Sequence, residues 1–373
     1  ALGHVWTLLS YIGPFLFVLG LVIFVHEYGH YIVGRWCGVA IDAFAIGFGP
    51  RLVGWRDKRG TEWKLCAIPL GGYVKFRGDL NGTSMPDNEL GDRMTAAERS
   101  VAFQFKPVWQ RAAIVAAGPI FNFILALAIF VGTLVFVGRL EVAPVVENVV
   151  AGSPAEAAGI KPGDRILMID GAKVDTFDDI RSVVSGLDHD LVKVEIEREG
   201  RILTLDVQSR VVEQRTNLGV FRSRVLGVSS SGQEGHRKHV KYGLGDAVVI
   251  GAGQVVGVVN QSVRFLSGLV AGRESADQLS GPIRIAQVSG KVAEHGLLSL
   301  LTLAAIISIS IGFINLMPIP MLDGGHLVFY AFEAVFGRPL SRRSQDFFFR
   351  IGFALVLALM AFSVVNDVIQ IAR

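Results

Sequence analysis

Four long apolar segments restrict the folds open to this chain more than any other feature of its sequence. They cover residues 8–33, 112–137, 297–322 and 351–371. Each could cross a bilayer, which takes about 20 residues of helix. Only 18% of the residues are charged, whereas soluble domains carry roughly a quarter. The sequence therefore predicts a polytopic α-helical membrane protein, with the lipid bilayer as its first partner.

Composition also excludes several other classes of protein. The net charge of +3 is small and Lys and Arg form no dense tract, so no nucleic-acid partner is expected. Two cysteines are too few for the disulfide framework of a small secreted domain. Because 51% of the residues are hydrophobic, disorder is excluded over most of the chain.

Basic residues in the short loops indicate the orientation of the chain. The loop between the first two apolar segments and the loop between the last two are rich in Lys and Arg, whereas neither residue precedes the first segment. Short basic loops stay in the cytoplasm. We therefore expect both loops inside, and the N-terminus, residues 138–296 and the C-terminus outside.

The segment outside the membrane has its own pattern. Residues 142–212 alternate between apolar and polar side chains, as half-buried strands do. Ser153 and Pro154 fit the start of a short helix, and a second helix fits about 176–187. The run 152–171 resembles the signature of the PDZ family, whose members capture peptides by adding a strand to a sheet edge. The alternative is a small folded spacer without a ligand.

The predicted domains follow from these changes of character. Residues 1–137 and 297–373 form the two parts of a membrane domain, and residues 142–212 form an α+β PDZ-like domain between them. Residues 213–296 are predicted as a linker, with an amphipathic or surface-lying helix at about 247–269.

The string His26-Glu27-Tyr28-Gly29-His30 is the strongest chemical signal in the sequence. On a helix, residues four apart lie one turn above each other, so both imidazoles can bind one metal ion. Glu27 then sits beside the first ligand, where it can act as a general base on water. The alternative is a buried polar cluster that only packs helices. Because ionisable residues are costly inside a membrane and usually functional, we favour a zinc site.

A catalytic zinc site takes about three protein ligands and keeps one position open. Asp323 follows the third apolar segment, in a run that begins at Asn315 and ends at His326. The first and third segments both run from outside to inside, so Asp323 should lie at the depth of the His26 motif. His326 is a rival ligand; alternatively, it is a hydrogen-bonded residue at a helix end.

In combination, three motifs make the chain similar to the site-2 protease family of intramembrane metalloproteases. They are HExxH in the first segment, GPxxN at Gly118, Pro119 and Asn122, and NxxPxPxLDGG from Asn315. With the PDZ-like insert, the chain is most similar to the bacterial RseP/MmpA-type branch. The resemblance implies Zn²⁺ held by His26, His30 and Asp323, Glu27 as the catalytic base, and Asn315 and Asn122 at the bound substrate.

The resemblance also implies a substrate class and a location. Family members cut the transmembrane segment of a membrane protein that another protease has already trimmed, in regulated intramembrane proteolysis. An anti-sigma factor or a remnant signal peptide would be such a substrate. The expected location is the bacterial inner membrane, with the active site towards the cytoplasm and the PDZ-like domain in the periplasm. The best-known members carry two PDZ domains, whereas one is recognisable here.

Residues 43–76 are predicted to form a β-hairpin with a bulky apolar face on the cytoplasmic side. Extended backbone at membrane depth must be buried in protein or line a wet cavity. The family resemblance implies a membrane-associated sheet beside the zinc, whose edge could hold the substrate as an added strand. The alternative is an amphipathic lid without substrate contact.

Two other functions are compatible with parts of the sequence. One is a non-enzymatic membrane receptor or scaffold with a PDZ-like domain and a structural metal site, but a structural zinc normally has four protein ligands. The other is a transporter, which four segments without paired repeat halves do not favour. We therefore expect a zinc-dependent intramembrane endopeptidase.

Overall fold

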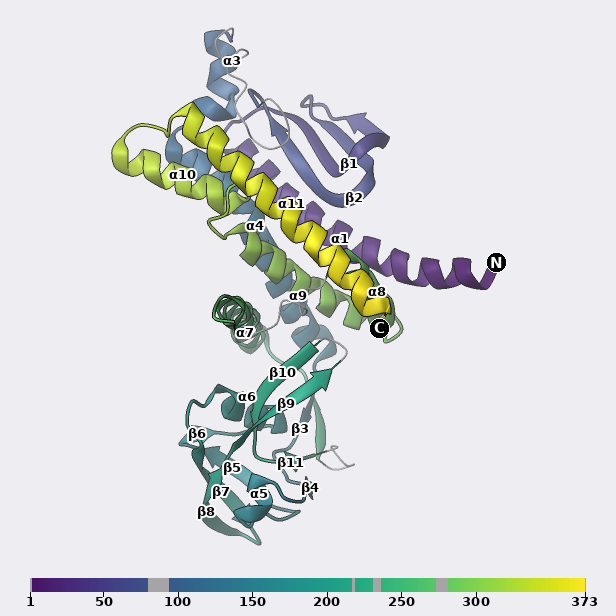
Figure 1. Cartoon of the computed structure of the whole chain (residues 1–373), viewed down its shortest axis with the longest axis vertical. Coiled ribbons are helices and arrows are strands. Elements are labelled where there is room, and N and C mark those ends of the chain that lie inside the picture. Colours follow the sequence, from purple (N-terminus) through teal and green to yellow (C-terminus); the bar gives the residue numbers. More distant parts are fainter. Residues whose placement is uncertain (1, 80–93, 217–218, 231–235, 273–280, 373) are drawn as a thin grey trace. The chain divides into compact units, whose positions relative to one another are not determined.

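A computed structural model describes residues 2–79, 94–216, 219–230, 236–272 and 281–372 of the chain (Figure 1). The chain divides into two compact units. The membrane unit consists of Ala1–Gly132 and Asp246–Arg373, and the inserted unit of Thr133–Gly245. Parts of the predicted linker, at 217–218, 231–235 and 273–280, lie outside the described residues.

The membrane unit contains the helices long and apolar enough to span a bilayer. Four such spans lie within the described residues, at Ser10–Trp36, Val108–Val137, Leu297–Asn315 and Arg343–Gln370. The helices of this unit are α1 (Leu2–Trp36), α3 (Ala96–Val101), α4 (Val108–Gly132), α7 (Leu244–Val270), α8 (Pro282–Ala293), α9 (Leu297–Asn315), α10 (Asp323–Phe336) and α11 (Arg342–Ala372). A 3₁₀ turn (Phe103–Phe105) precedes α4, and a π-helical turn (Thr133–Val137) follows it.

The third predicted span, 297–322, is too long, because α9 ends at Asn315. Pro318 and Pro320 lie just beyond that end, and a proline inside a helix removes one hydrogen bond and clashes with the preceding turn. The chain turns there and starts again as α10, which was not predicted. Asp323 is therefore the first residue of a new helix and not the end of the third span.

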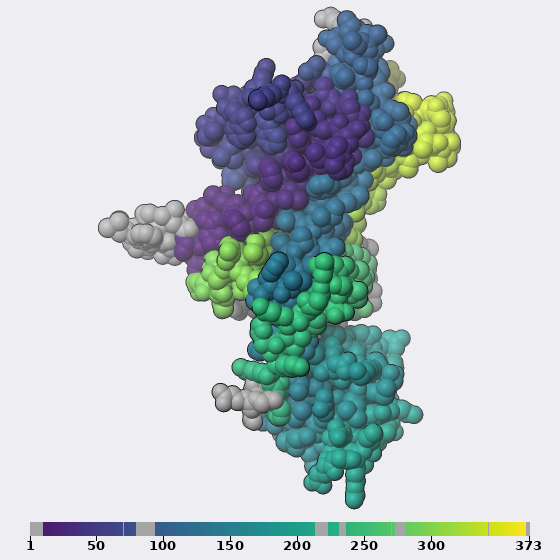
Figure 2. All heavy atoms as spheres, turned by 180° about the vertical axis from the view of Figure 1, so that it is seen from behind, coloured from purple at the N-terminus to yellow at the C-terminus, as the bar shows by residue number. Residues whose placement is uncertain are grey.

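Helix α1 is the centre of the membrane unit. It packs against α4, α8, α9 and the hairpin strands, and Figure 2 shows the purple spheres of α1 beside the blue spheres of α4. One buried cluster joins α1 to the hairpin, α4 and α10; it includes Tyr31, Phe44, Phe76, Ile114 and Tyr330. A second cluster joins α4 to α9 and α7 through Ala126, Phe130, Ala305, Ile309 and Val258.

The predicted hairpin at 43–76 is present as two antiparallel strands, β1 (Ile41–Arg56) and β2 (Glu62–Phe76). The turn between them is fixed by Asp57, whose carboxylate accepts hydrogen bonds from the backbone N–H groups of Arg59 and Thr61. Figure 1 shows the hairpin beside the C-terminal half of α1. The structure confirms a hairpin next to the helix that carries the HExxH motif.

The hairpin is not a simple two-stranded ribbon, because different parts of each strand make separate pairings. Residues 41–46 pair with 72–76 on one side and with 62–65 on the other. Residues 51–56 pair with the outer side of 62–66. Among the described strands, residues 72–76 pair with 41–46 on one side. Their other side is the outer edge of the hairpin sheet and borders the candidate site.

Helices α7 and α8 occupy the region predicted as a linker. Helix α7 confirms the helix expected at about 247–269, whereas α8 was not predicted. The start of α8 is held by Asp367 of α11, a buried carboxylate that accepts hydrogen bonds from the backbone N–H groups of Gly281, Ile283 and Arg284 at 2.9–3.1 Å. These contacts satisfy N–H groups that a helix leaves unpaired at its start.

The inserted unit is an α+β domain around its own core. A four-stranded sheet has the order β6-β5-β7-β8. The strands and helices of the whole inserted unit are β3 (Arg139–Val142), β4 (Asn148–Val149), α5 (Pro154–Ala157), β5 (Arg165–Ile169), β6 (Ala172–Lys173), α6 (Phe177–Gly186), β7 (Leu191–Arg198), β8 (Arg201–Gln208), β9 (Arg210–Thr216), β10 (Gly219–Val225), β11 (Val228–Ser229) and β12 (Arg237–Val240). Ser153 caps α5 and Thr176 caps α6, at the predicted helix starts.

The boundary predicted for this domain, 142–212, is too short. Strand β11 pairs with β4, and β12 pairs with β3, so the end of the unit returns to its beginning. Leu226 is part of the buried core together with Val146 and Ile166. Because these strands are short and follow a polar stretch, their alternation is not recognisable in the sequence.

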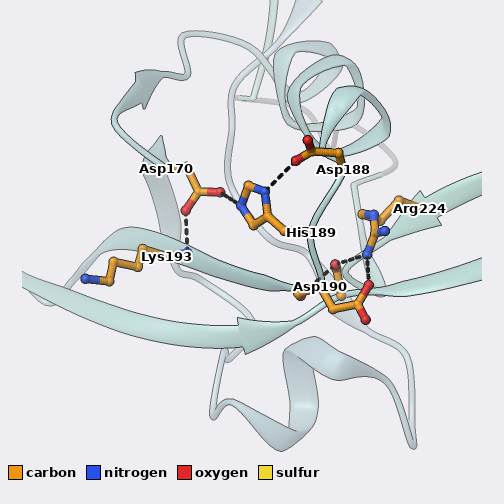
Figure 3. A network of polar contacts seen from close by, with 7 residues as sticks. Asp170, Asp188, His189, Asp190, Lys193 and Arg224 are labelled. Atoms are coloured by element: carbon orange, nitrogen blue, oxygen red, sulfur yellow. Dashed lines mark hydrogen bonds and ion pairs between the residues drawn. The ribbon is translucent and has the colours of Figure 1, made fainter.

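Polar contacts hold the loop between α6 and β7 (Figure 3). The imidazole of His189 lies between the carboxylates of Asp188 and Asp170, 2.9 Å from each. Hydrogen bonds to Asp188 and Asp170 raise the pKa of His189. Arg224 of β10 donates to Asp190 in the same loop. The loop thereby ties the end of α6 to both the sheet and the β9–β10 hairpin.

The most buried ion pair of the inserted unit gives a prediction about its stability. Asp164 is 1% exposed and accepts two hydrogen bonds from Arg198 and one from the Lys161 N–H, each at 2.7 Å. Burial alone would raise the pKa of Asp164, but these partners hold it below its usual range. In a fragment covering residues 133–245, Asp164→Asn should lower the free energy of unfolding by about 2 kcal/mol at pH 7.

The difference should depend on pH in one direction. A lowered carboxyl pKa contributes stability above the unfolded value near 4, and this contribution is lost as the pH falls through the folded value. The wild-type and mutant melting curves should therefore converge in acid. Asp175→Asn, which removes an exposed pair with Lys173, is the control and should change stability by less than about 1 kcal/mol. Equal effects of the two substitutions would contradict this account.

Candidate metal centre

Three side chains from two helices converge in the membrane unit. His26 and His30 lie one turn apart on α1, and their Nε2 atoms are 3.3 Å apart. Asp323 approaches from the start of α10, with Oδ2 3.2 Å from Nε2 of His26 and Oδ1 3.6 Å from Nε2 of His30. The distant segments of the sequence thus meet at one point, as the topology predicted.

The separation of the donor atoms suits a zinc ion. Zinc binds histidine nitrogen and carboxylate oxygen at about 2.0–2.2 Å in tetrahedral geometry, which puts neighbouring ligand atoms about 3.3 Å apart. The three donor atoms lie within 4.8 Å of one another and form the only such group of three among the described residues. Two imidazoles and one carboxylate also match the donor types of catalytic zinc sites.

The site is buried and electrostatically balanced. His26 and His30 are 8% and 9% exposed, and Glu27 is 9% exposed. Burial alone would raise the pKa of Asp323, but the imidazoles of His30 and His26 hold it below its usual range. Asp323 is also the first residue of α10, where the helix dipole favours a negative charge. Asp323 is therefore suited to stay ionised in an apolar surrounding.

The other nitrogen of each imidazole has its own partner on α4. Nδ1 of His30 donates to the backbone carbonyl of Ile114 at 2.9 Å. Nδ1 of His26 lies 3.2 Å from the side-chain nitrogen of Asn122. Asn122 is itself completely buried. Both rings therefore turn Nε2 towards Asp323.

Helix α4 comes so close to the histidines that it needs a glycine at the contact. A Cβ atom built on Gly118 would lie 2.3 Å from Nε2 of His30 and 2.9 Å from Cε1 of His26. Atoms that are not bonded cannot approach so closely. The glycine of the GPxxN motif is therefore explained by the space that the two imidazoles occupy.

A cavity of about 740 Å³ opens beside the three donor atoms. Glu27 and Asn315 line it, together with residues 72–76 of β2, which form the outer edge of the hairpin sheet. A neighbouring cavity of about 480 Å³ is mostly apolar and reaches from Glu27 along α1, α8 and α9, past Leu19, Ile285 and Ile311. The site thus borders the edge of a sheet on one side and an apolar cavity on the other.

The structure brings most of the predicted site residues together. His26, Glu27, His30 and Asp323 meet, and Asn315 lines the same cavity. His326 lines the cavity too, but its ring packs against Phe349, 5.3 Å away between centroids, and it is outside the group of donor atoms. Asn122 reaches His26 and is not among the residues that line either cavity.

Sequence reasoning missed several contributors. The carbonyl of Ile114 left no signal, because a main-chain oxygen does not depend on residue type. Ser308 donates to the backbone carbonyl of Asn122 at 2.9 Å, and a polar residue within an apolar span could have drawn attention to it. The need for a glycine at 118 became clear only from the close packing of α4 on α1.

Comparisons with known proteins agree with this site. The sequence profile of Peptidase family M50 matches residues 14–359. A protein of Rhizobium meliloti named as a zinc metalloprotease is 49% identical over 358 residues, which cover 96% of both chains. A protein of Agrobacterium fabrum with a similar name is 47% identical over 362 residues, 97% of this chain and 96% of the relative. Metalloprotease MmpA of Caulobacter vibrioides is 43% identical over 376 residues, 94% of each.

The family match covers more than nine-tenths of the chain, and these relatives match over nearly their full length. A multi-pass membrane protein with a zinc cofactor and peptidase activity follows from them and from the four apolar helices. The chain therefore belongs to Peptidase family M50, the site-2 protease family of intramembrane zinc metalloproteases.

Proposed function

We propose that His26, His30 and Asp323 hold the zinc ion of this protease. The observation that carries the proposal is the spacing of their donor atoms, 3.2–3.6 Å, which agrees with the roughly 3.3 Å of a tetrahedral zinc site. Among the described residues, three protein donors converge, which leaves a position open for chemistry. A closed structural site in a receptor or scaffold would need a fourth ligand.

Glu27 is the proposed general base. It follows His26 directly, is buried, and lines the cavity next to the donor atoms. When bound, zinc acts as a Lewis acid that polarises the scissile carbonyl and lowers the pKa of water. Glu27 takes the proton from the attacking water and delivers it to the leaving amine, so that the peptide bond is hydrolysed.

The substrate is proposed to bind as an added strand. The outer edge of 72–76, opposite the side that pairs with 41–46, borders the cavity that contains Glu27. Strand addition provides main-chain hydrogen bonds without fixing the sequence of the bound chain. It also unwinds a helical segment, whose peptide bonds are otherwise shielded from attack. Asn315 lies at the junction of both cavities, where it can contact the bound chain.

The proposed substrate is a transmembrane segment of a membrane protein, as in regulated intramembrane proteolysis. An apolar cavity beside the donor atoms supports this class. An anti-sigma factor or a remnant signal peptide, already cut once by another protease, would fit. The excess of Lys and Arg in the loops next to α1, α4 and α11 supports a location in the bacterial inner membrane with the site towards the cytoplasm.

The inserted unit is proposed to be a periplasmic PDZ-like domain that selects substrates. A groove of about 360 Å³ runs between α6 and the segment 226–228, and Phe177, Ile180 and Val184 line its apolar side. Arg181 and Arg224 also border it. Because all the proposed zinc ligands belong to the membrane unit, hydrolysis does not require this domain.

Glu27→Gln should separate metal binding from catalysis. The amide occupies the same volume but cannot accept the proton of water. We expect stoichiometric zinc and a fall of about 10²- to 10⁴-fold in cleavage of a transmembrane fusion substrate. Metal analysis beside a cleavage assay measures both quantities. Turnover near the wild-type rate would show that Glu27 is not the base.

Asp323→Ala should remove a ligand, whereas His326→Ala should not. We expect Asp323→Ala to weaken zinc binding by more than about 100-fold, and cleavage to fall with it. Loss of a residue that only contacts a zinc ligand usually costs about 10- to 100-fold in affinity. His326→Ala is the matched control and should keep its zinc. If His326→Ala lost zinc while Asp323→Ala retained it, the third ligand would be wrongly assigned.

Replacing residues 139–240 by a short linker tests the inserted unit. If the unit is a steric filter, its removal should allow untrimmed substrates to be cut. If it is a docking site, its removal should slow the cutting of trimmed substrates. We favour the filter and expect cleavage of an untrimmed substrate to appear while zinc content is unchanged. Loss of all cleavage in a folded, zinc-loaded variant would assign this unit to the catalytic machinery.

A further inference from the structure

We infer that Asn122 is a positioning residue for His26: it fixes which imidazole nitrogen faces the zinc, and it does not bind the substrate. This inference rests on the proposal that His26 holds the metal and adds a residue to that site. It differs from the role that the GPxxN motif suggested for Asn122.

The first observation is where the side chain lies. Asn122 is 0% exposed and is absent from the residues that line the two cavities beside the donor atoms. A substrate in either cavity would contact other residues first. The side-chain nitrogen of Asn122 instead lies 3.2 Å from Nδ1 of His26, within hydrogen-bond distance.

The second observation concerns the protons of the imidazole. Nε2 of His26 faces Asp323 and His30, so it is the nitrogen that would bind the metal. A neutral imidazole that binds through Nε2 must carry its proton on Nδ1, which becomes a donor. Its partner must then be an acceptor, and Asn122 can supply one with its amide oxygen.

The amide can meet this need by turning about its terminal bond. A half-turn exchanges the oxygen and the nitrogen without moving the rest of the side chain. Among the described residues the oxygen has no partner in the present orientation. The contact with His26 is the side-chain hydrogen bond that the amide of Asn122 makes among the described residues, so it decides which orientation is preferred. Metal on Nε2 selects the orientation in which the oxygen accepts the Nδ1 proton.

The two histidines are held in different ways. Nδ1 of His30 donates to the main-chain carbonyl of Ile114, which no substitution removes. Nδ1 of His26 depends on a side chain. Asn122 lies one turn after Gly118 on α4, so the motif that provides space for the imidazoles also provides the contact for one of them. Ser308 of α9 donates to the backbone carbonyl of Asn122 and helps to fix this turn of α4.

The experiment compares zinc affinity in three variants of the full-length protein. Asn122→Leu keeps the number and branching of the side-chain heavy atoms but removes the acceptor, and Asn122→Ala removes the side chain beyond Cβ. Asn122→Asp keeps an acceptor, and a carboxylate is a common partner of zinc-bound histidine. Competition with a chelator measures affinity, and the visible spectrum of the Co²⁺-substituted protein reports the ligand geometry.

We expect Asn122→Leu and Asn122→Ala to weaken zinc binding by about 10- to 100-fold, and Asn122→Asp to stay within about threefold of the wild type. The Co²⁺ spectrum should change in the first two and remain in the third. If Asn122→Leu fails to fold, Asn122→Ala carries the test. An equal loss in Asn122→Asp would mean that an acceptor at this position does not preserve zinc binding, and it would overturn the inference. Unchanged affinity in Asn122→Leu would mean that Asn122 only fills space, and unchanged affinity in Asn122→Ala that it has no part in the site; either result would also overturn the inference.

A second asparagine provides the matched control. Asn315 lines both cavities and is proposed to contact the substrate. Asn315→Leu should raise KM and leave zinc affinity unchanged, whereas Asn122→Leu, once saturated with zinc, should leave KM unchanged. A raised KM with normal zinc affinity in Asn122→Leu would restore the role of a substrate contact.

His26→Ala distinguishes this inference from the proposal beneath it. Retention of zinc by His26→Ala would refute the proposed ligand set as a whole. Loss of zinc in His26→Ala, combined with normal affinity in Asn122→Leu, would refute only the role of Asn122.

Discussion

The fold of the membrane unit depends on the contact between two imidazoles and one carboxylate inside an apolar helix bundle. Polar groups are expensive in such surroundings unless they meet each other or a metal. Their meeting requires α4 to approach α1 at Gly118, and it requires the chain to turn after α9 so that Asp323 can start a new helix. The break after Asn315 thus has a function, because it delivers the carboxylate to the histidines.

The hairpin brings the edge of a sheet to the same contact. A metal site alone does not cut a transmembrane helix, because the peptide bond must be presented in extended form. The outer edge at 72–76 borders the cavity that contains Glu27, so the proposed base and the proposed binding edge lie together. The inserted unit has its own core and contributes none of the donor atoms. Selection of a substrate and its hydrolysis can therefore be separate tasks.

Much of this arrangement could be predicted from the sequence, for identifiable reasons. Apolar length predicted the four spans. The four-residue spacing of His26 and His30 predicted that their imidazoles lie together on one face of a helix. That Asp323 lies near the two histidines was predicted from the first and third apolar segments, which cross the membrane in the same direction. The start of α10 could not be predicted, because the effect of Pro318 and Pro320 on the following turn depends on packing. Nor could the contact of Asn122 with His26, since it depends on the rotation of α4 against α1. The late strands that complete the inserted unit were also missed, because pairing between distant short segments leaves little local pattern.

The central claim is that two histidines and one carboxylate hold the zinc ion. X-ray absorption spectroscopy of the purified, zinc-loaded protein tests it most directly, because the ligand shell is measured without reference to activity. The account predicts two imidazole nitrogens and oxygen ligands at about 2.0–2.2 Å, with no sulfur. A sulfur shell at about 2.3 Å, which only Cys37, Cys66 or a methionine could supply, or the signature of a single imidazole would contradict it.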